Sequence, residues 1–294
     1  MEILLGVVEQ GLIYGIMALG IYITYKILDF PDLTVDGSFP LGAAVAAVLV
    51  TKGVNPYLAL LAAFGAGILA GICTGLIHVK LKVRDLLSGI IMMTALYTVN
   101  LKIAGKANIP LFSKATIFSN AFLDSVIPEF LKPYSTLIII LIITLIAKYL
   151  LDWYLRTRSG YLLRAVGDND VLVTCLAKDR GLVKIVGLAI SNGLVALGGA
   201  VYAHEETYFD ISFGTGTMVI GLASVIIGTN LFKNVTVLRT TSSILIGSIL
   251  YKGCISVALL CGLDPQSVKM ITAALLLLIL VLSMDRRKKV KINA

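Results

Sequence analysis

Two short stretches of acidic and hydroxyl residues interrupt an otherwise apolar sequence. The first, 29–39, reads DFPDLTVDGSF, and the second, 204–216, reads HEETYFDISFGTG. Where such groups lie at membrane depth they must face protein or water, because a charge facing lipid costs at least about 2.5–3.5 kcal/mol. We therefore predict a polar path for a solute, lined by Asp32, Thr34, Asp36, Ser38, Glu205, Glu206, Asp210 and Ser212.

A surface-loop interpretation and a metal-site interpretation compete with the polar path. If the helix boundaries shift by a few residues, both stretches are surface loops with solvated acids, and the residues alone favour neither reading. A zinc-protease helix requires H-E-x-x-H, but Tyr208 stands where the second histidine is needed, and His78 is expected at the opposite membrane face. With no C-x-x-C pair and no Ser/His or paired-Asp arrangement, we expect neither a metal site nor enzymatic activity.

The composition is that of an integral membrane protein. Of 294 residues, 58% are hydrophobic and 14% are charged, and the mean hydropathy is +0.94, which is too apolar for a soluble domain of this length. The net charge of +8 does not indicate nucleic acid binding, because the basic residues stand at the ends of apolar runs. We expect membrane lipid, and not nucleic acid, around the chain.

The apolar runs predict an all-α fold with about nine transmembrane helices, in a range of about eight to ten. The predicted spans are 4–28, 40–51, 57–79, 86–105, 135–151, 183–203, 217–232, 241–260 and 267–284. We interpret residues 1–294 as a single transmembrane domain. Its parts are an N-terminal half at 1–134, a polar loop at 152–184, a C-terminal half at 183–284 and a basic tail at 285–294.

Basic residues predict the orientation, because cytoplasmic loops collect Lys and Arg. The loop 152–184 and the tail 285–294 are the two richest segments, so both are expected on the cytoplasmic side. The four predicted spans between them, an even number, agree with this assignment. Counting back along the chain places the N-terminus outside.

The second predicted span has about twelve residues, roughly 18 Å of helix, which is too short to cross a membrane alone. Part of 29–39 must then lie at membrane depth. The stretch 204–216 follows the same order of full span, acidic interruption and glycine-rich restart, and the predicted topology runs the two units in opposite directions. Paired interruptions of this kind indicate an inverted repeat with a transport site at its interface.

A stripe of glycines predicts a close contact between helices. Gly67, Gly71 and Gly75 recur every fourth residue in the third span, a spacing that lets two membrane helices bring their backbones together. We interpret this stripe as packing, with no catalytic role.

The loop 152–184 predicts two short helices held between membrane spans. Ser159 is placed to cap the first helix and Gly167 to end it, and one of Asp168, Asn169 or Asp170 is placed to cap the second. Such a rigid knob suits docking to a partner protein. The residues alone equally favour a capped loop that lies on the bilayer, with its Arg and Lys side chains on lipid phosphates.

A resemblance to a known family bears on this choice. Residues 162–203, LLRAVGDNDVLVTCLAKDRGLVKIVGLAISNGLVALGGAVYA, closely resemble the loop signature of permease subunits from ATP-binding-cassette (ABC) importers of the branched-chain amino acid and ribose type. Within that group the sequence is most similar to the tryptophan/tyrosine-type amino acid permeases. The similarity extends to FGTGTMVIGLASVIIG at 213–228 and to GLIYGIMALGIYITYKILDF at 11–30.

In such permeases the loop is a coupling helix that sits in a groove of a separate ATPase subunit. The resemblance implies that the ATPase is contacted by Leu162, Leu163, Arg164, Ala165, Val166, Gly167, Asp168 and Asn169. It also implies a homodimer in a bacterial cell membrane, an extracytoplasmic solute-binding lipoprotein as a partner, and ATP with Mg on the ATPase subunit rather than on this chain. The sequence contains no G-x-x-x-x-G-K-[ST] phosphate loop.

The leading expectation is therefore the membrane-spanning subunit of an ABC importer for a small polar solute, which the resemblance indicates is an amino acid, aromatic or branched-chain. One alternative is an ABC importer of a sugar or nucleoside. Another is a secondary transporter driven by an ion gradient, which the interruptions and the intramembrane carboxylates would serve equally well. An adjacent ATPase gene would support the importer, and an isolated gene would favour the ion-driven transporter.

Overall fold

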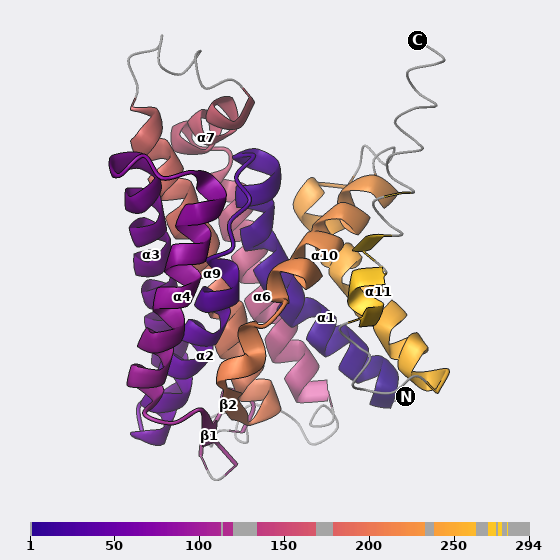
Figure 1. Cartoon of the computed structure of the whole chain (residues 1–294). Coiled ribbons are helices and arrows are strands. Elements are labelled where there is room, and N and C mark those ends of the chain that lie inside the picture. Colours follow the sequence, from indigo (N-terminus) through magenta and orange to yellow (C-terminus); the bar gives the residue numbers. More distant parts are fainter. Residues whose placement is uncertain are drawn as a thin grey trace.

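The computed structural model describes residues 2–112, 114–119, 134–168, 179–232 and 238–262, together with 270–274, 276–277 and 281. Helices make up nearly all of its regular structure (Figure 1). In chain order the elements are α1 (Glu2–Ile21), the π-helix η1 (Tyr22–Ile27), α2 (Val35–Thr51), α3 (Pro56–Lys80), α4 (Asp85–Ala104), β1 (Asn108–Pro110), α6 (Ser135–Tyr154), α7 (Arg158–Asp168), α9 (Arg180–Glu206), β2 (Tyr208–Asp210), the 3-10 helix η3 (Ile211–Gly214), α10 (Thr217–Leu231) and α11 (Thr240–Leu260).

The predicted all-α class is confirmed, whereas the count of about nine spans is not. The described residues contain seven helices that are long and apolar enough to cross a membrane, and α2, with 17 residues, is shorter. In this count α1 continues through η1, and η3 leads into α10. The last predicted span, 267–284, lies largely outside the described residues.

The sequence predicts that the second span begins at Pro40, but α2 begins at Val35. The carboxylate of Asp32 accepts a hydrogen bond from the backbone N–H of Thr34 at 2.9 Å, and this turn starts the helix before the proline. Pro40 lies inside α2, where it leaves the carbonyl of Asp36 without its usual helical donor. At 1.5 Å per residue α2 is about 25 Å long, still short of a hydrocarbon core of about 30 Å.

Two interruptions lie toward opposite ends of the bundle. The first, 28–34, follows η1 beside α7, and the second, 207–216, contains β2, which pairs antiparallel with β1. Figure 1 shows α7 at one end and the two strands at the other, which we call the α7 end and the strand end. Both interruptions are shorter than predicted, because α2 includes Asp36 and Ser38, and α9 includes Glu205 and Glu206.

Helix α9 packs against α1, α2 and α3. The three glycines of the α3 stripe lie directly against α9, at Asn192, Leu188 and Ile185. Helices α1 and α2 come equally close to α9 through Gly20 and Gly42. Because glycine has no side chain to separate two backbones, these contacts bring the helices together along their length.

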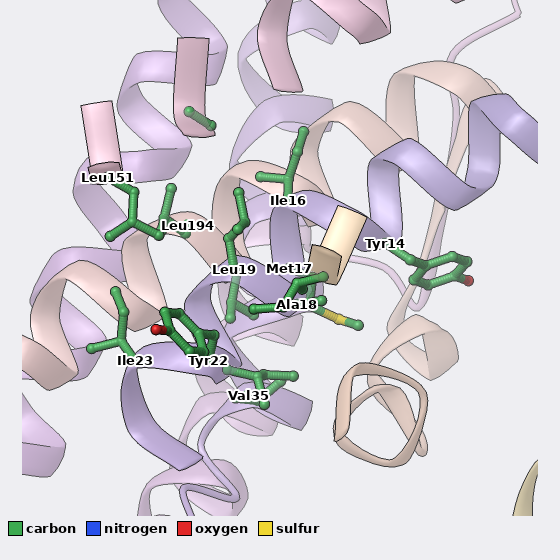
Figure 2. Packing of buried hydrophobic residues seen from close by; sticks show 14 of the residues in the cluster. Tyr14, Ile16, Met17, Ala18, Leu19, Tyr22, Ile23, Val35, Leu151 and Leu194 are labelled. Carbon is green, nitrogen blue, oxygen red and sulfur yellow. The ribbon is translucent and has the colours of Figure 1, made fainter. Parts of the chain in front are cut away.

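Apolar side chains fill the space between α1, α6 and α9. Ile16, Leu19, Leu151 and Leu194 are buried in one continuous cluster (Figure 2). Helices α10 and α11 pack on each other and on α1. The described helices therefore form one packed bundle, from which α7 and the strand pair project at opposite ends (Figure 1).

Replacing Gly71 with valine is expected to destabilise the protein by about 1–3 kcal/mol or more, because the new side chain would collide with the carbonyl oxygen of Leu188. Gly65→Val in the same helix is the matched control, since a Cβ at Gly65 meets nothing within 4 Å. Thermal unfolding of both variants in lipid nanodiscs measures the difference. Equal melting temperatures would contradict the close contact between α3 and α9.

Candidate functional site at the two interruptions

Three of the predicted path residues form a buried network between the start of α2, α3 and α9. Asp32, Thr34 and Ser38 are 1%, 0% and 0% exposed. Nδ2 of Asn192 donates to the Asp32 carboxylate at 2.8 Å, and the Ser38 hydroxyl donates to Oδ1 of Asn192 at 2.6 Å. The hydroxyls of Thr34 and Thr74 are 2.9 Å apart. The network joins the start of α2 to α9 and α3, and its groups are withdrawn from solvent.

Asp36 connects the two interruptions. Its carboxylate accepts hydrogen bonds from the backbone N–H of Met218 at 2.8 Å, that of Gly216 at 3.3 Å and the hydroxyl of Thr217 at 2.9 Å. These residues form the N-terminus of α10, where the first N–H groups have no partner within the helix. Gly216, at the capping position, has a φ of +85° and no side chain. A carboxylate from α2 therefore caps α10, and its charge suits the positive end of the helix dipole.

Asp210 and Ser212 form a local turn at the strand end. Asp210 accepts hydrogen bonds from the N–H and the hydroxyl of Ser212 at 2.7 and 2.5 Å, and from Nδ2 of Asn108 at 3.3 Å. Partial burial acts to raise the pKa of Asp210, but the hydrogen bonds outweigh it and hold the pKa below its ordinary value. Asp210 is therefore a carboxylate that starts η3 and ties it to β1.

Glu205 and Glu206 are the last two residues of α9. The amide nitrogen of Gln10 on α1 lies 3.5 Å from Oε1 of Glu205 and 3.3 Å from Oε1 of Glu206.

The structure thus divides the eight predicted path residues among the buried network, the α10 cap and the strand end. Across the described ranges, no three His, Cys, Asp or Glu side chains gather as metal ligands.

Seven of the eight predicted coupling residues lie on α7, and Asn169 lies outside the described residues. One face of α7 is buried, with Leu163 0% and Val166 3% exposed and Gly167 against the carbonyl of Ile27. The other face presents Tyr161, Arg164 and Asp168. Leu163, Val166 and Gly167 therefore seat the helix on η1 and α9, and the exposed face is the one free to meet a partner.

Sequence reasoning missed Asn192 and an ionic contact at the α7 end. Asp152, near the end of α6, is 8% exposed and accepts hydrogen bonds from Nη1 of Arg239 at 3.1 Å and the hydroxyl of Thr241 at 2.7 Å. Nζ of Lys148, one turn earlier, is 3.7 Å away. The contact ties α6, just before α7, to the start of α11. The available signals were a lone amide within one apolar span and a carboxylate at the end of another.

A known protein family matches nearly the whole chain. Residues 3–281 match a family described as the branched-chain amino acid transport system / permease component. The chain belongs to this permease family. The resemblance found in the sequence is thereby confirmed, and with its apolar helices the protein is a transmembrane permease of the ABC type.

Individual relatives narrow the comparison. The permease is 43% identical over 274 residues to the tyrosine transport system permease protein of Clostridioides difficile (strain R20291), covering 93% of this chain and 89% of the relative. It is 34% identical over 280 residues to an uncharacterized protein of Rickettsia prowazekii (strain Madrid E), covering 94% and 96%. It is 26% identical over 225 residues to the ribose import permease protein of Escherichia coli (strain K12), covering 76% and 68%. No solved structure matches the permease.

Asp36→Ala is expected to lower the free energy of unfolding by about 1–3 kcal/mol, because the N-terminus of α10 loses a charged acceptor. Asp36→Asn keeps one acceptor oxygen without the charge, and its free energy of unfolding should lie between those of the alanine variant and the native protein. Thermal unfolding reports the loss, and hydrogen exchange should increase at residues 216–218. An alanine variant with native stability and native exchange at α10 would contradict the cap.

Asn192→Leu is expected to destabilise the permease by about 2–5 kcal/mol, because Asp32 and Ser38 both lose a buried partner. Ser38→Ala is the milder comparison and should cost about 1 kcal/mol, since only one hydrogen bond is lost. Size-exclusion chromatography after stepwise heating measures how much intact protein remains. If the two variants lose intact protein at the same temperature, Asn192 does not hold the network together.

Proposed function

We propose that the permease is the membrane-spanning subunit of an ATP-driven ABC importer for an amino acid. The observation that carries the proposal is the 43% identity to a tyrosine transport system permease over 93% of the chain, within a family whose description names amino acid transport. The ribose import permease supports the importer class, but at 26% identity over 76% of the chain it supports a sugar less strongly. An aromatic or branched-chain amino acid is the proposed solute.

The permease itself carries out no covalent chemistry in this proposal. ATP and Mg bind to a separate ATPase subunit, and an extracytoplasmic solute-binding lipoprotein delivers the solute to a permease homodimer in the bacterial cell membrane. The basic residues between α6 and α9 support a cytoplasmic α7 end. The strand end and the N-terminus then face outside.

The two interrupted units form the inverted repeat and the solute path of this proposal. Helix α1 leads to the interruption at the α7 end, and α9 leads to the interruption at the strand end (Figure 1). Interrupted helices of opposite direction surround the solute site in many transporters. We place the path beside the contact of Asp36 with α10, because Asp36 is partly exposed whereas Asp32 is buried.

The decisive experiment joins the permease to its ATPase in lipid nanodiscs. ATP hydrolysis is measured with no binding protein, with empty binding protein and with binding protein loaded with single amino acids. Stimulation by the loaded protein alone is the expected result, and it identifies the solute. If the ATPase fails to associate and uptake follows an imposed ion gradient, the importer proposal is wrong.

The exposed face of α7 is the proposed contact with the ATPase. Arg164→Glu is expected to weaken association by at least about tenfold, as for a buried interface arginine, while the melting temperature stays native. Lys52→Glu reverses an exposed charge at the strand end and is the matched control. Gly167 is a poor test, because any side chain there would collide with the carbonyl of Ile27 and unseat α7. Native association of the Arg164 variant would show that the ATPase does not bind at this face of α7.

A further inference from the structure

The strand end holds two carboxylates in an unfavourable position. Glu205 and Glu206 are adjacent, partly buried and at the C-terminus of α9, where the helix dipole disfavours negative charge. Gln10 reaches both, but at 3.5 and 3.3 Å its bonds are long. Oε2 of Glu205 is buried and has no hydrogen-bond partner among the described residues. The contacts within the described residues therefore leave part of this negative charge without a close partner.

A cation stands nearby without neutralising them directly. Lys252 on α11 is partly buried, and its Nζ lies 5.4 Å from the centre of the Tyr14 ring. The lysine is within electrostatic range of Glu205 and Glu206, yet it forms no ion pair with either in the described part of the chain. The Tyr202 hydroxyl also lies next to Glu206, so among the described residues the groups without a direct partner are Oε2 of Glu205 and, apart from the Tyr14 ring, the ammonium group of Lys252.

Aromatic rings line the same place. The Tyr14 and Tyr202 rings are 5.6 Å apart, and the ring of Phe213 lies 5.0 Å from Tyr202 and 5.1 Å from Tyr208. Tyr14 lies at the edge of the apolar core, with its hydroxyl directed away from the other labelled residues (Figure 2). Ring faces attract cations and ring edges pack on other rings. We call Glu205, Glu206, Lys252 and these rings the acidic–aromatic cluster.

We propose that the acidic–aromatic cluster recognises the zwitterion of an amino acid, with Glu205 and Glu206 taking its ammonium group and Lys252 taking its carboxylate. The inference rests on the proposed function and names the chemistry of its solute. A zwitterion brings a cation to the two acids and an anion to the lysine without changing the net charge of the cluster. The rings contact one another in this structure, so the proposal requires Tyr208 and Phe213, which belong to the second interruption, to move aside when the solute binds.

Three compounds with one phenol ring test the proposal. L-tyrosine carries both charged groups, tyramine lacks the carboxylate, and 3-(4-hydroxyphenyl)propionate lacks the ammonium group. Equilibrium dialysis of radiolabelled L-tyrosine against the permease and ATPase complex in nanodiscs, without binding protein, should show saturable binding. Each analogue should compete at least about tenfold more weakly, as expected for the loss of one charged contact.

Two variants assign the contacts. Glu206→Gln should reduce the difference in affinity between tyrosine and the propionate. Lys252→Met should reduce the difference in affinity between tyrosine and tyramine. Asp29→Asn at the first interruption and Lys52→Met, both exposed, are the matched controls and should bind as the native protein does.

Absence of saturable tyrosine binding, or equal competition by all three compounds in the native protein, would overturn the proposal. In that case ATP hydrolysis stimulated by loaded binding protein would still support the importer. Loss of that stimulation in the native complex would instead overturn the proposed function.

Discussion

The cap that Asp36 places on α10 is the interaction on which the arrangement of the two halves depends. Backbone N–H groups at the start of a helix need partners, and inside a hydrocarbon core water does not supply them. Helix α10 begins after a glycine with no capping side chain, and Asp36 of α2 bonds the N–H groups of Gly216 and Met218 at its start. Helix α2 in turn begins at the turn made by Asp32, whose second oxygen is held by Asn192 of α9. The first half therefore supplies the cap of α10, and the second half supplies Asn192, which holds the carboxylate that starts α2.

Close contact between helix backbones is a second constraint, and it also follows from the apolar, water-free surroundings of a membrane helix. Lipid tails are as apolar as leucine, so membrane helices gain little by burying apolar surface and associate through packing and hydrogen bonds. Helix α9 meets its neighbours across glycines, and its Ser191 hydroxyl donates to the carbonyl of Gly20 on α1 at 2.7 Å. The result is a closely packed block of α1, α2, α3 and α9. Helices α10 and α11 pack on α1 of this block, where Gly11 lies against Ile249, and the polar contacts of Asp36 and Asp152 tie them further to α2 and α6.

The long helices were predictable from the sequence because the thickness of the hydrocarbon core sets their length. The predicted spans 57–79 and 86–105 match α3 and α4 within one residue at each end. The start of α2 was wrong because proline is common in a first helical turn, whereas the turn at Asp32 depends on a partner in a distant span. Strands β1 and β2 pair across 102 residues, and three-residue strands carry no local pattern. Asp32 and Asp36 are both carboxylates of the predicted path. Only the structure shows that Asp32 is buried in a network whereas Asp36 caps α10.

A force applied to the exposed face of α7 would be transmitted to the bundle through two sets of contacts. On one side Gly167 lies so close to the carbonyl of Ile27 that no side chain fits between α7 and η1, and η1 leads directly into the first interruption. On the other side α7 follows α6, whose Asp152 is bonded to Arg239 at the start of α11. Closely packed elements shift as units because their interiors do not deform continuously. A displacement of α7 would therefore reach both the Asp32–Asn192 network and the α10–α11 pair, which are the two parts that Asp36 joins.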